Sequence, residues 1–104
     1  DPQTEWAALQ TALQQAGEYI RKRRRRVAQT AGETQAAIFD AHALLLQDPA
    51  LLERAHRSIQ NGQNAAAAWQ AAVEQAASEY DALPDEYLRQ RAADVRDVGR
   101  QVLL

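Results

Sequence analysis

Cysteine and methionine are both absent from the 104 residues, and the sequence has only four glycines and three prolines. Without cysteine, disulfides, thiol catalysis and thiolate metal sites are excluded. No apolar run approaches the roughly 18 residues that cross a bilayer, and the amino end lacks the basic and apolar regions of a signal peptide. We therefore expect a soluble, cytoplasmic chain. Because no initiator methionine stands at Asp1, we also expect a piece of a longer protein.

The net charge is small as well. A formal charge of −2 at pH 7 and a pI near 5.6 give the molecule no general attraction for polyanions, so a nucleic-acid site would need a local basic patch. A chain of this length buries about two thirds of its extended surface on folding, which is enough for one core. Residues 1–104 are accordingly predicted to form a single domain.

Alanine and glutamine are abundant, and together with scarce glycine and proline they favour helix almost throughout. Capping residues, prolines and Asn-Gly or Ala-Gly stops divide the chain into helices expected at about residues 2–30, 33–47, 49–60 and 65–80, and from Pro84 to beyond Leu104. Short connections leave neighbouring helices antiparallel. The predicted fold is all-α, with four to five helices arranged as two packed antiparallel hairpins.

Apolar residues recur at spacings of three and four in the longer helices and mark their buried stripes. The first stripe is interrupted only by Arg23, which we expect to meet a carboxylate from another helix. The three stripes comprise Trp6, Leu9, Leu13, Ala16, Ile20, Val27 and Thr30; Ala65, Ala68, Trp69, Ala72, Val73, Ala76 and Tyr80; and Tyr87, Leu88, Ala92, Val95, Val98 and Val102.

The segment AAIFDAHALLLQDPAL, from Ala36 to Leu51, is more apolar than one core contact requires. An amphipathic helix needs about three or four apolar residues per two turns. Here two adjoining faces are apolar, one with Ile38, His42 and Leu45 and the other with Phe39, Ala43 and Leu46. One side of this helix is therefore a candidate partner surface, and burial on two sides is the alternative.

Six consecutive basic residues, Arg21 to Arg26, are the most conspicuous charged feature. Clustered arginines can bind phosphates, but six residues in a row point in every direction around a helix, and no aromatic or amide side chains stand between them to read bases. A solvated helix surface is the favoured interpretation, with polyanion binding as the alternative.

Residues suited to catalysis or metal binding are sparse. Glu53 and His56 have the spacing of half a carboxylate-bridged di-metal site, but the second half is missing. No serine has an evident histidine and acid partner, and no glycine-rich phosphate loop is present. Arg91 borders the last apolar stripe, where it could face a partner or pair with Asp94. No catalysis is expected from these residues alone, and no metal or other cofactor.

Two stretches resemble a known family: AIFDAHALLLQDPAL, from Ala37 to Leu51, and DEYLRQRAADVRDVGRQVL, from Asp85 to Leu103. Together they are similar to the amino-terminal helical domain of enzyme I of the bacterial phosphoenolpyruvate-dependent sugar phosphotransferase system, or of a paralogue such as a multiphosphoryl transfer protein. The resemblance covers almost the whole chain, although the run from Arg21 to Arg26 is not part of the family pattern.

The resemblance implies a docking domain of a phosphoenolpyruvate–protein phosphotransferase. Such a domain binds the small phosphocarrier HPr and positions its histidine beside the phosphohistidine of a neighbouring domain of the same parent chain. Magnesium and phosphoenolpyruvate would belong to a further domain, and no nucleic acid or membrane partner is implied. The carrier-contacting positions of the family fall here on Ala37, His42, Leu44, Leu45, Asp48, Ala50, Leu51, Tyr80, Leu88 and Arg91, with Leu45 at the apolar centre.

Some positions depart from the family pattern. The family has carboxylates just before the AIF sequence and beside the Asp-Pro turn, whereas here the residues are Thr34, Gln35 and Ala36, then Gln47 and Ala50. The electrostatic part of the implied interface is therefore thin, which suits a less basic carrier or a tethered one. Two other classes remain open: a polyanion-binding module that uses Arg21 to Arg26, and a bundle that forms a homodimer through its apolar face.

Overall fold

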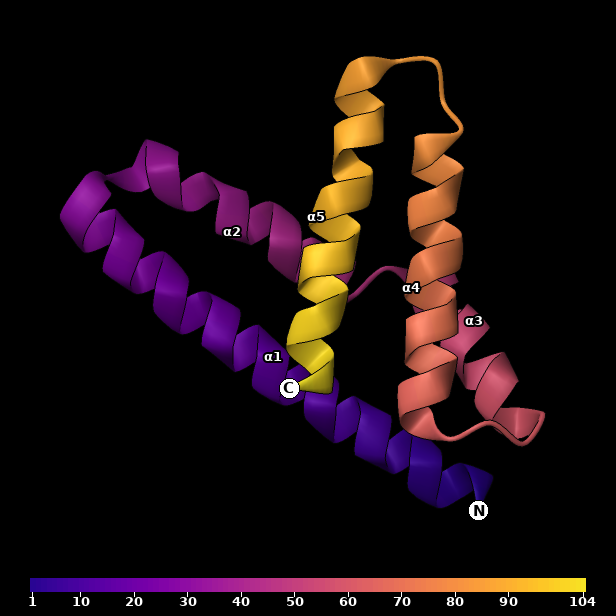
Figure 1. Ribbon diagram of the computed structural model, residues 1–104. Coiled ribbons are helices and arrows are strands. Elements are labelled where there is room, and N and C mark those ends of the chain that lie inside the picture. Colours follow the sequence, from indigo (N-terminus) through magenta and orange to yellow (C-terminus); the bar gives the residue numbers. More distant parts are fainter.

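Five α-helices make up most of the computed structural model, which describes all residues from 1 to 104 (Figure 1). They are α1 (Pro2–Ala31), α2 (Glu33–Leu45), α3 (Pro49–Gln60), α4 (Ala65–Asp81) and α5 (Glu86–Leu103). The all-helical prediction is confirmed, and α3 has the predicted limits. The second helix ends at Leu45 and not at Gln47, because the chain turns before Asp48. None of the five helices is both long and apolar enough to cross a membrane.

The predicted capping residues set the helix limits. The side chains of Asp1, Asp48 and Asn64 each accept a hydrogen bond from a backbone N–H in the first turn of the helix that follows, at 3.2, 3.0 and 2.8 Å. Gly32, with φ 97°, separates α1 from α2, and Gly62, with φ 104°, follows α3. Both glycines adopt left-handed backbone, which residues with a Cβ rarely tolerate, so each stops the preceding helix.

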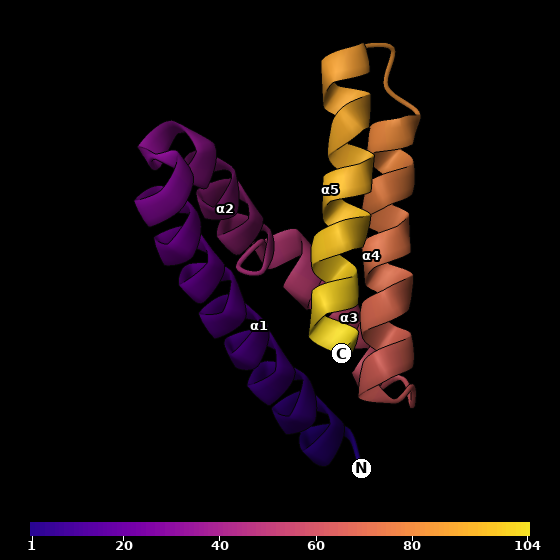
Figure 2. The same cartoon turned by 60° about the vertical axis from the view of Figure 1, so that its left-hand side comes forward.

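Two antiparallel hairpins organise the molecule, as predicted. α1 packs on α2 and α4 packs on α5, while α3 lies behind them against α4 and α1 (Figure 2). The hairpins meet where α1 contacts α4 and α5 and where α2 contacts α5. The molecule measures 44 × 34 × 19 Å. Since a helix with its side chains is about 10 Å across, the shortest dimension accommodates two layers of helices.

The core lies where the two hairpins and α3 converge, and every fully buried side chain in it is apolar. Trp69 of α4 is its largest member, and its indole Nε1 donates a 3.0 Å hydrogen bond to the carbonyl of Gly99 in α5. A Cβ at Gly99 would lie 2.6 Å from a methyl group of Val73, so α4 and α5 approach this closely only because position 99 has no side chain.

The ends of two predicted stripes are wrong. Thr30 is exposed, and so is Tyr87, with 72% of its surface accessible, although both were expected to be buried. The last turn of α1 and the first turn of α5 lie at the tips of their hairpins, far from the point where the hairpins meet (Figure 1). Periodicity assigns such residues to a helix face, but only the packing of other helices determines how far along that face the core extends.

Candidate functional site

The two apolar faces that the sequence assigns to the second helix are largely covered, since Ile38 alone of their six residues is exposed. The alternative, burial on two sides, therefore applies to them, and the other exposed apolar residues of α2 lie on a different side. Only Ala36 and Leu45 of this helix are fully buried, whereas Leu44 is 68% exposed and Ile38 is 52% exposed. Ala37 is also exposed and lies seven residues before Leu44, which places both on one side of the helix. This side lies next to the one that meets α1, because Asp40, which binds Arg24 of α1, is about 40° from Leu44 and 60° from Ala37 around the helix. An apolar surface is thus available for a partner.

Two of the leucines predicted to contact a partner belong to the core instead. Leu45 is 8% exposed and Leu51 is 4% exposed, and both join the main hydrophobic cluster. Leu44 and Leu45 are 100° apart around α2, so they face solvent and core respectively. The centre of any interface on this helix is therefore expected at Leu44 and not at Leu45.

The turn between α2 and α3 places further predicted residues beside Leu44. Asp48 is half-buried, and its Oδ1 accepts from the backbone N–H of Ala50, whose own side chain is exposed. That carboxylate is the cap of α3 and is only partly free to pair with a cation from another protein. Ala37, Leu44, Asp48 and Ala50 are called the α2–α3 face below.

The remaining predicted contacts come from α4 and α5. Tyr80, Leu88 and Arg91 are all half-buried, and the guanidinium of Arg91 lies 5.9 Å from the centre of the Tyr80 ring. The sequence left two possibilities for Arg91, a contact with a partner or a pair with Asp94. In the structure a cation–π contact with Tyr80 holds Arg91 in place. An ion pair of 2.6 Å between Arg54 of α3 and Glu79 of α4 fixes the last turns of α4 beside α3. This ion pair therefore fixes Tyr80, and with it Arg91, relative to α3.

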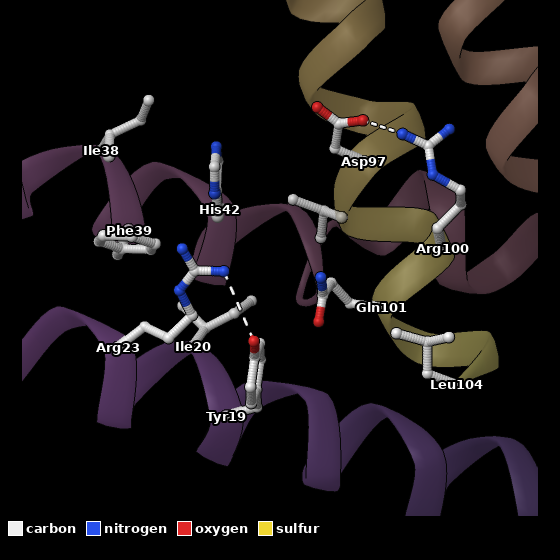
Figure 3. A pocket seen from close by; sticks show the side chains of 11 residues that line it. Tyr19, Ile20, Arg23, Ile38, Phe39, His42, Asp97, Arg100, Gln101 and Leu104 are labelled. Carbon is white, nitrogen blue, oxygen red and sulfur yellow. Dashed lines mark hydrogen bonds and ion pairs between the residues drawn. The ribbon is translucent and has the colours of Figure 1, made fainter.

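His42 lies in a cleft between α1, α2 and α5 with a volume of about 530 Å³ (Figure 3). Its ring meets the edge of Phe39 at a centroid distance of 5.9 Å, and its Nε2 is buried without a hydrogen-bond partner. The cleft is also lined by Tyr19, Arg23, Ile38 and, directly after α5, Leu104. His42 is thus directed toward this cleft and lies beside the α2–α3 face, not at its centre.

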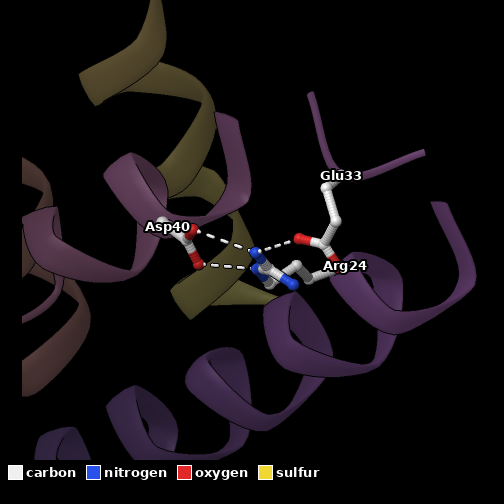
Figure 4. A network of polar contacts seen from close by, with 3 residues as sticks. All are labelled: Arg24, Glu33 and Asp40. Atoms are coloured by element: carbon white, nitrogen blue, oxygen red, sulfur yellow. Dashed lines mark hydrogen bonds and ion pairs between the residues drawn. The ribbon is translucent and has the colours of Figure 1, made fainter. Parts of the chain in front are cut away.

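Arg24, and not Arg23, joins α1 to carboxylates of α2 (Figure 4). Its guanidinium donates to Asp40 at 2.7 and 3.3 Å and to Glu33 at 2.9 Å. These hydrogen bonds, first the one to Asp40, raise the pKa of Arg24 above its ordinary value. The expectation that Arg23 meets a carboxylate is wrong: its guanidinium lies 5.4 Å from the centre of the Phe39 ring. One residue step turns the side chain by 100°, from the carboxylates to the aromatic ring.

The second histidine has a packing role. His56 of α3 stacks on Trp6 of α1, with ring centroids 4.1 Å apart, and Glu53 binds Arg57 at 2.8 Å. No group of three or more histidine, aspartate or glutamate side chains gathers anywhere in the chain in an arrangement that could hold a metal ion.

Ile38 and Phe39 were identified in the sequence only as parts of apolar faces. Their place beside the cleft depends on where α5 ends, which periodicity does not reveal.

Comparison with known proteins agrees with this geometry. Residues 1–91 match the protein family described as "PEP-utilising enzyme, N-terminal". The chain is 36% identical over 104 residues to a phosphoenolpyruvate-protein phosphotransferase of Listeria monocytogenes, and the match covers 99% of this chain and 18% of that protein. For the same enzyme of Enterococcus faecalis the identity is 34% over 105 residues. The chain thus spans about a fifth of the length of these curated relatives.

Solved structures show the same fold. A solution structure of Enzyme I superposes with a TM-score of 0.91 at 36% identity, over 98% of this chain and 42% of that one. A structure described as the N-terminal domain of Enzyme 1 - Nitrogen gives a TM-score of 0.90 at 35% identity, over 99% and 43% of the two chains.

Fold and sequence together define the class as the helical amino-terminal region of enzymes that use phosphoenolpyruvate. Within that class, the chain belongs to the family of enzyme I of the phosphoenolpyruvate-dependent phosphotransferase system, of which it represents the amino-terminal helical domain.

Proposed function

We propose that this domain docks an HPr-like phosphocarrier protein on its α2–α3 face and so positions the carrier's histidine for phosphoryl transfer. The phosphoryl donor would be a phosphohistidine in a neighbouring domain of the parent enzyme, and magnesium would serve only the domain that binds phosphoenolpyruvate. The contribution of these 104 residues is positioning, which lowers the entropic part of the barrier without any catalytic side chain.

The observation that carries the proposal is the exposed apolar surface formed by Ala37 and Leu44 beside the α2–α3 turn. Leu44 is 68% exposed, so its side chain contributes little to the core of this fold. At protein interfaces such residues fill the apolar centre, while polar groups form the rim. Arg91, held over Tyr80, is suited to a rim contact with an acidic group.

The test is a calorimetric titration of the HPr-type carrier from the same source into the 104-residue chain and into a Leu44→Asp variant. A charge at Leu44 would be buried against the carrier, so we expect binding to weaken by at least about 2 kcal/mol, or roughly thirtyfold. The free variant should keep its stability, because Leu44 contacts little of the core. Unchanged affinity in a folded Leu44→Asp variant would show that the carrier docks elsewhere.

Leu103→Asp supplies the matched control, since Leu103 is 43% exposed, lies in the last turn of α5 against α4 and does not line the cleft of His42. The same chemical change there should leave carrier binding intact. Leu45→Asp should instead destabilise the fold by at least about 3 kcal/mol, because it places a charge in the core. Sedimentation of the free chain tests the homodimer alternative: self-association that Leu44→Asp abolishes, in a chain that does not bind the carrier, would favour that alternative.

A further inference from the structure

The basic run divides into two sets of different character. Arg24 takes up Glu33 and Asp40, the carboxylates that α2 offers to this part of α1. Arg21, Lys22, Arg25 and Arg26 are exposed and make no ion pair or side-chain hydrogen bond. Arg23 binds only aromatic residues, so five cations have no carboxylate partner within two helical turns of a molecule whose net charge is −2. The solvated-surface interpretation accounts for their exposure, but it does not account for their concentration.

Three of the cations share one side of α1 with a phenol. Tyr19, Lys22, Arg23 and Arg26 follow one another at spacings of three, one and three residues, which places them on a common face. Together with Val27 they line a hollow of about 320 Å³ that contains no carboxylate. Arg21 and Arg25 point away from the hollow, because they lie about 160° and 120° from Tyr19 around the helix, whereas the three cations that line the hollow lie within about 60° of it.

One cation of this hollow is already held in place. The Arg23 guanidinium donates a 3.5 Å hydrogen bond to the hydroxyl of Tyr19 and lies 5.8 Å from that ring and 5.4 Å from the ring of Phe39 (Figure 3). Aromatic neighbours on two helices restrict its rotamers before any ligand arrives. A fixed guanidinium loses less side-chain entropy on binding an anion than a free one does.

We propose that this hollow, lined by Tyr19, Lys22, Arg23 and Arg26, is a binding site for a small phosphate-bearing anion. Guanidinium and ammonium donors that line one hollow suit a compact ligand with several acceptor oxygens and at least two negative charges. Nucleic acid fits less well, since the face has no amide side chain to read base edges and the molecule is acidic overall. The site is separate from the α2–α3 face and does not depend on carrier docking.

Inorganic pyrophosphate is the probe, followed through the backbone amide NMR signals of the 104-residue chain at moderate salt. We expect saturable shifts confined to residues 19–27 and the facing part of α2. Lys22→Gln/Arg26→Gln should weaken binding at least about tenfold, because it removes two of the three cations that face the hollow.

The matched control is Arg21→Gln/Arg25→Gln, which removes the same two charges from the opposite side of the same turns. Its affinity for pyrophosphate should fall less than about threefold, since charges that do not touch the ligand are screened over about 8 Å at physiological salt. Equal losses in the two variants would mean diffuse attraction without a site, and absence of saturable shifts would likewise overturn the proposal. The proposal would also be overturned if an RNA duplex displaced pyrophosphate and bound both double variants equally weakly. All four side chains are exposed, so both variants should fold.

Discussion

At the residue scale, Gly99 marks the point where α4 and α5 approach too closely for a side chain. A methyl group at this position would lie 2.6 Å from Val73, so Gly99→Ala forces α4 and α5 apart. We expect this change to destabilise the fold by about 1–3 kcal/mol, as overpacking of a core does, even though alanine has the higher helix propensity. Urea unfolding followed by circular dichroism measures the loss.

The double variant Gly99→Ala/Val73→Ala separates overpacking from other causes. Val73→Ala alone leaves a cavity, and a methyl group at position 99 would partly fill it. The combined loss should therefore be smaller than the sum of the two single losses by at least about 0.5 kcal/mol. Additive losses would mean that Gly99→Ala acts through the Trp69 hydrogen bond to the backbone and not through Val73.

Neighbouring residues also show where prediction from the sequence ends. Leu44 and Leu45 both fit an apolar helix face, and Arg23 and Arg24 both fit a basic run, yet each pair divides between two environments. A helical step of 100° decides the division. Which residue of each pair faces which environment depends on where the neighbouring helix lies, and the spacing of apolar residues within one helix does not reveal this.

At the scale of single elements, Asp48 combines two roles that substitution can separate. As the N-cap of α3 it accepts from the N–H of Ala50, and asparagine caps about as well as aspartate. Asp48→Asn should thus leave the free energy of unfolding unchanged, whereas Asp48→Ala should cost about 1 kcal/mol. If Asp48 also meets a cation of the carrier, Asp48→Asn should weaken docking. Equal docking by wild type and Asp48→Asn would restrict Asp48 to its capping role.

The α4–α5 hairpin carries a pH-dependent contact on its surface. Arg96 of α5 donates to both carboxylate oxygens of Glu74 of α4, at 3.1 and 2.8 Å, and also binds Asp81 at 2.9 Å. The hydrogen bonds from Arg96 hold the pKa of Glu74 below its ordinary value of 4.5. Because the folded pKa is the lower one, this contact stabilises the hairpin at neutral pH, and the contribution is lost as the pH falls below 4.5 and through the folded pKa.

The comparison of wild type with Glu74→Gln tests this dependence. The variant should unfold at lower urea than wild type at pH 7, and the two midpoints should converge as the pH falls through the lowered pKa of Glu74. Glu18 makes no ion pair, so Glu18→Gln serves as the control, and its difference from wild type should not follow this trend. A Glu74→Gln difference that persists unchanged at low pH would contradict the assigned cause.

Elements were the most predictable level of this fold. The caps at Asp1, Asp48 and Asn64 and the stops at Gly32 and Gly62 act over a few residues, so the sequence alone indicated where helices begin and end. The exposed tips at Thr30 and Tyr87 were not predictable in the same way. Burial there depends on how far the other hairpin reaches.

At the scale of the whole molecule, the arrangement of carboxylates determines how docking should respond to salt. The family resemblance led us to expect a carboxylate beside the Asp-Pro turn, where this sequence has Gln47 and Ala50. Of the acids that remain nearby, Glu33 and Asp40 bind Arg24, and Asp48 caps α3. The α2–α3 face thus presents little free negative charge, and the sequence already indicated this weakness. The structure adds that the remaining carboxylates are engaged within the domain.

Carrier binding should therefore depend mainly on apolar contact. Raising the salt concentration from about 50 to about 200 mM should lower the affinity for the HPr-type carrier less than about threefold, because exposed charges contribute little to this interface. Calorimetric titrations at the two concentrations measure the change, and pyrophosphate binding at Lys22 and Arg26 should weaken more steeply over the same range. A loss of tenfold or more in carrier affinity would mean that charged side chains carry the docking after all. In that case Arg91, fixed over Tyr80, is the first residue to replace, since the family resemblance counts this half-buried cation among the carrier contacts.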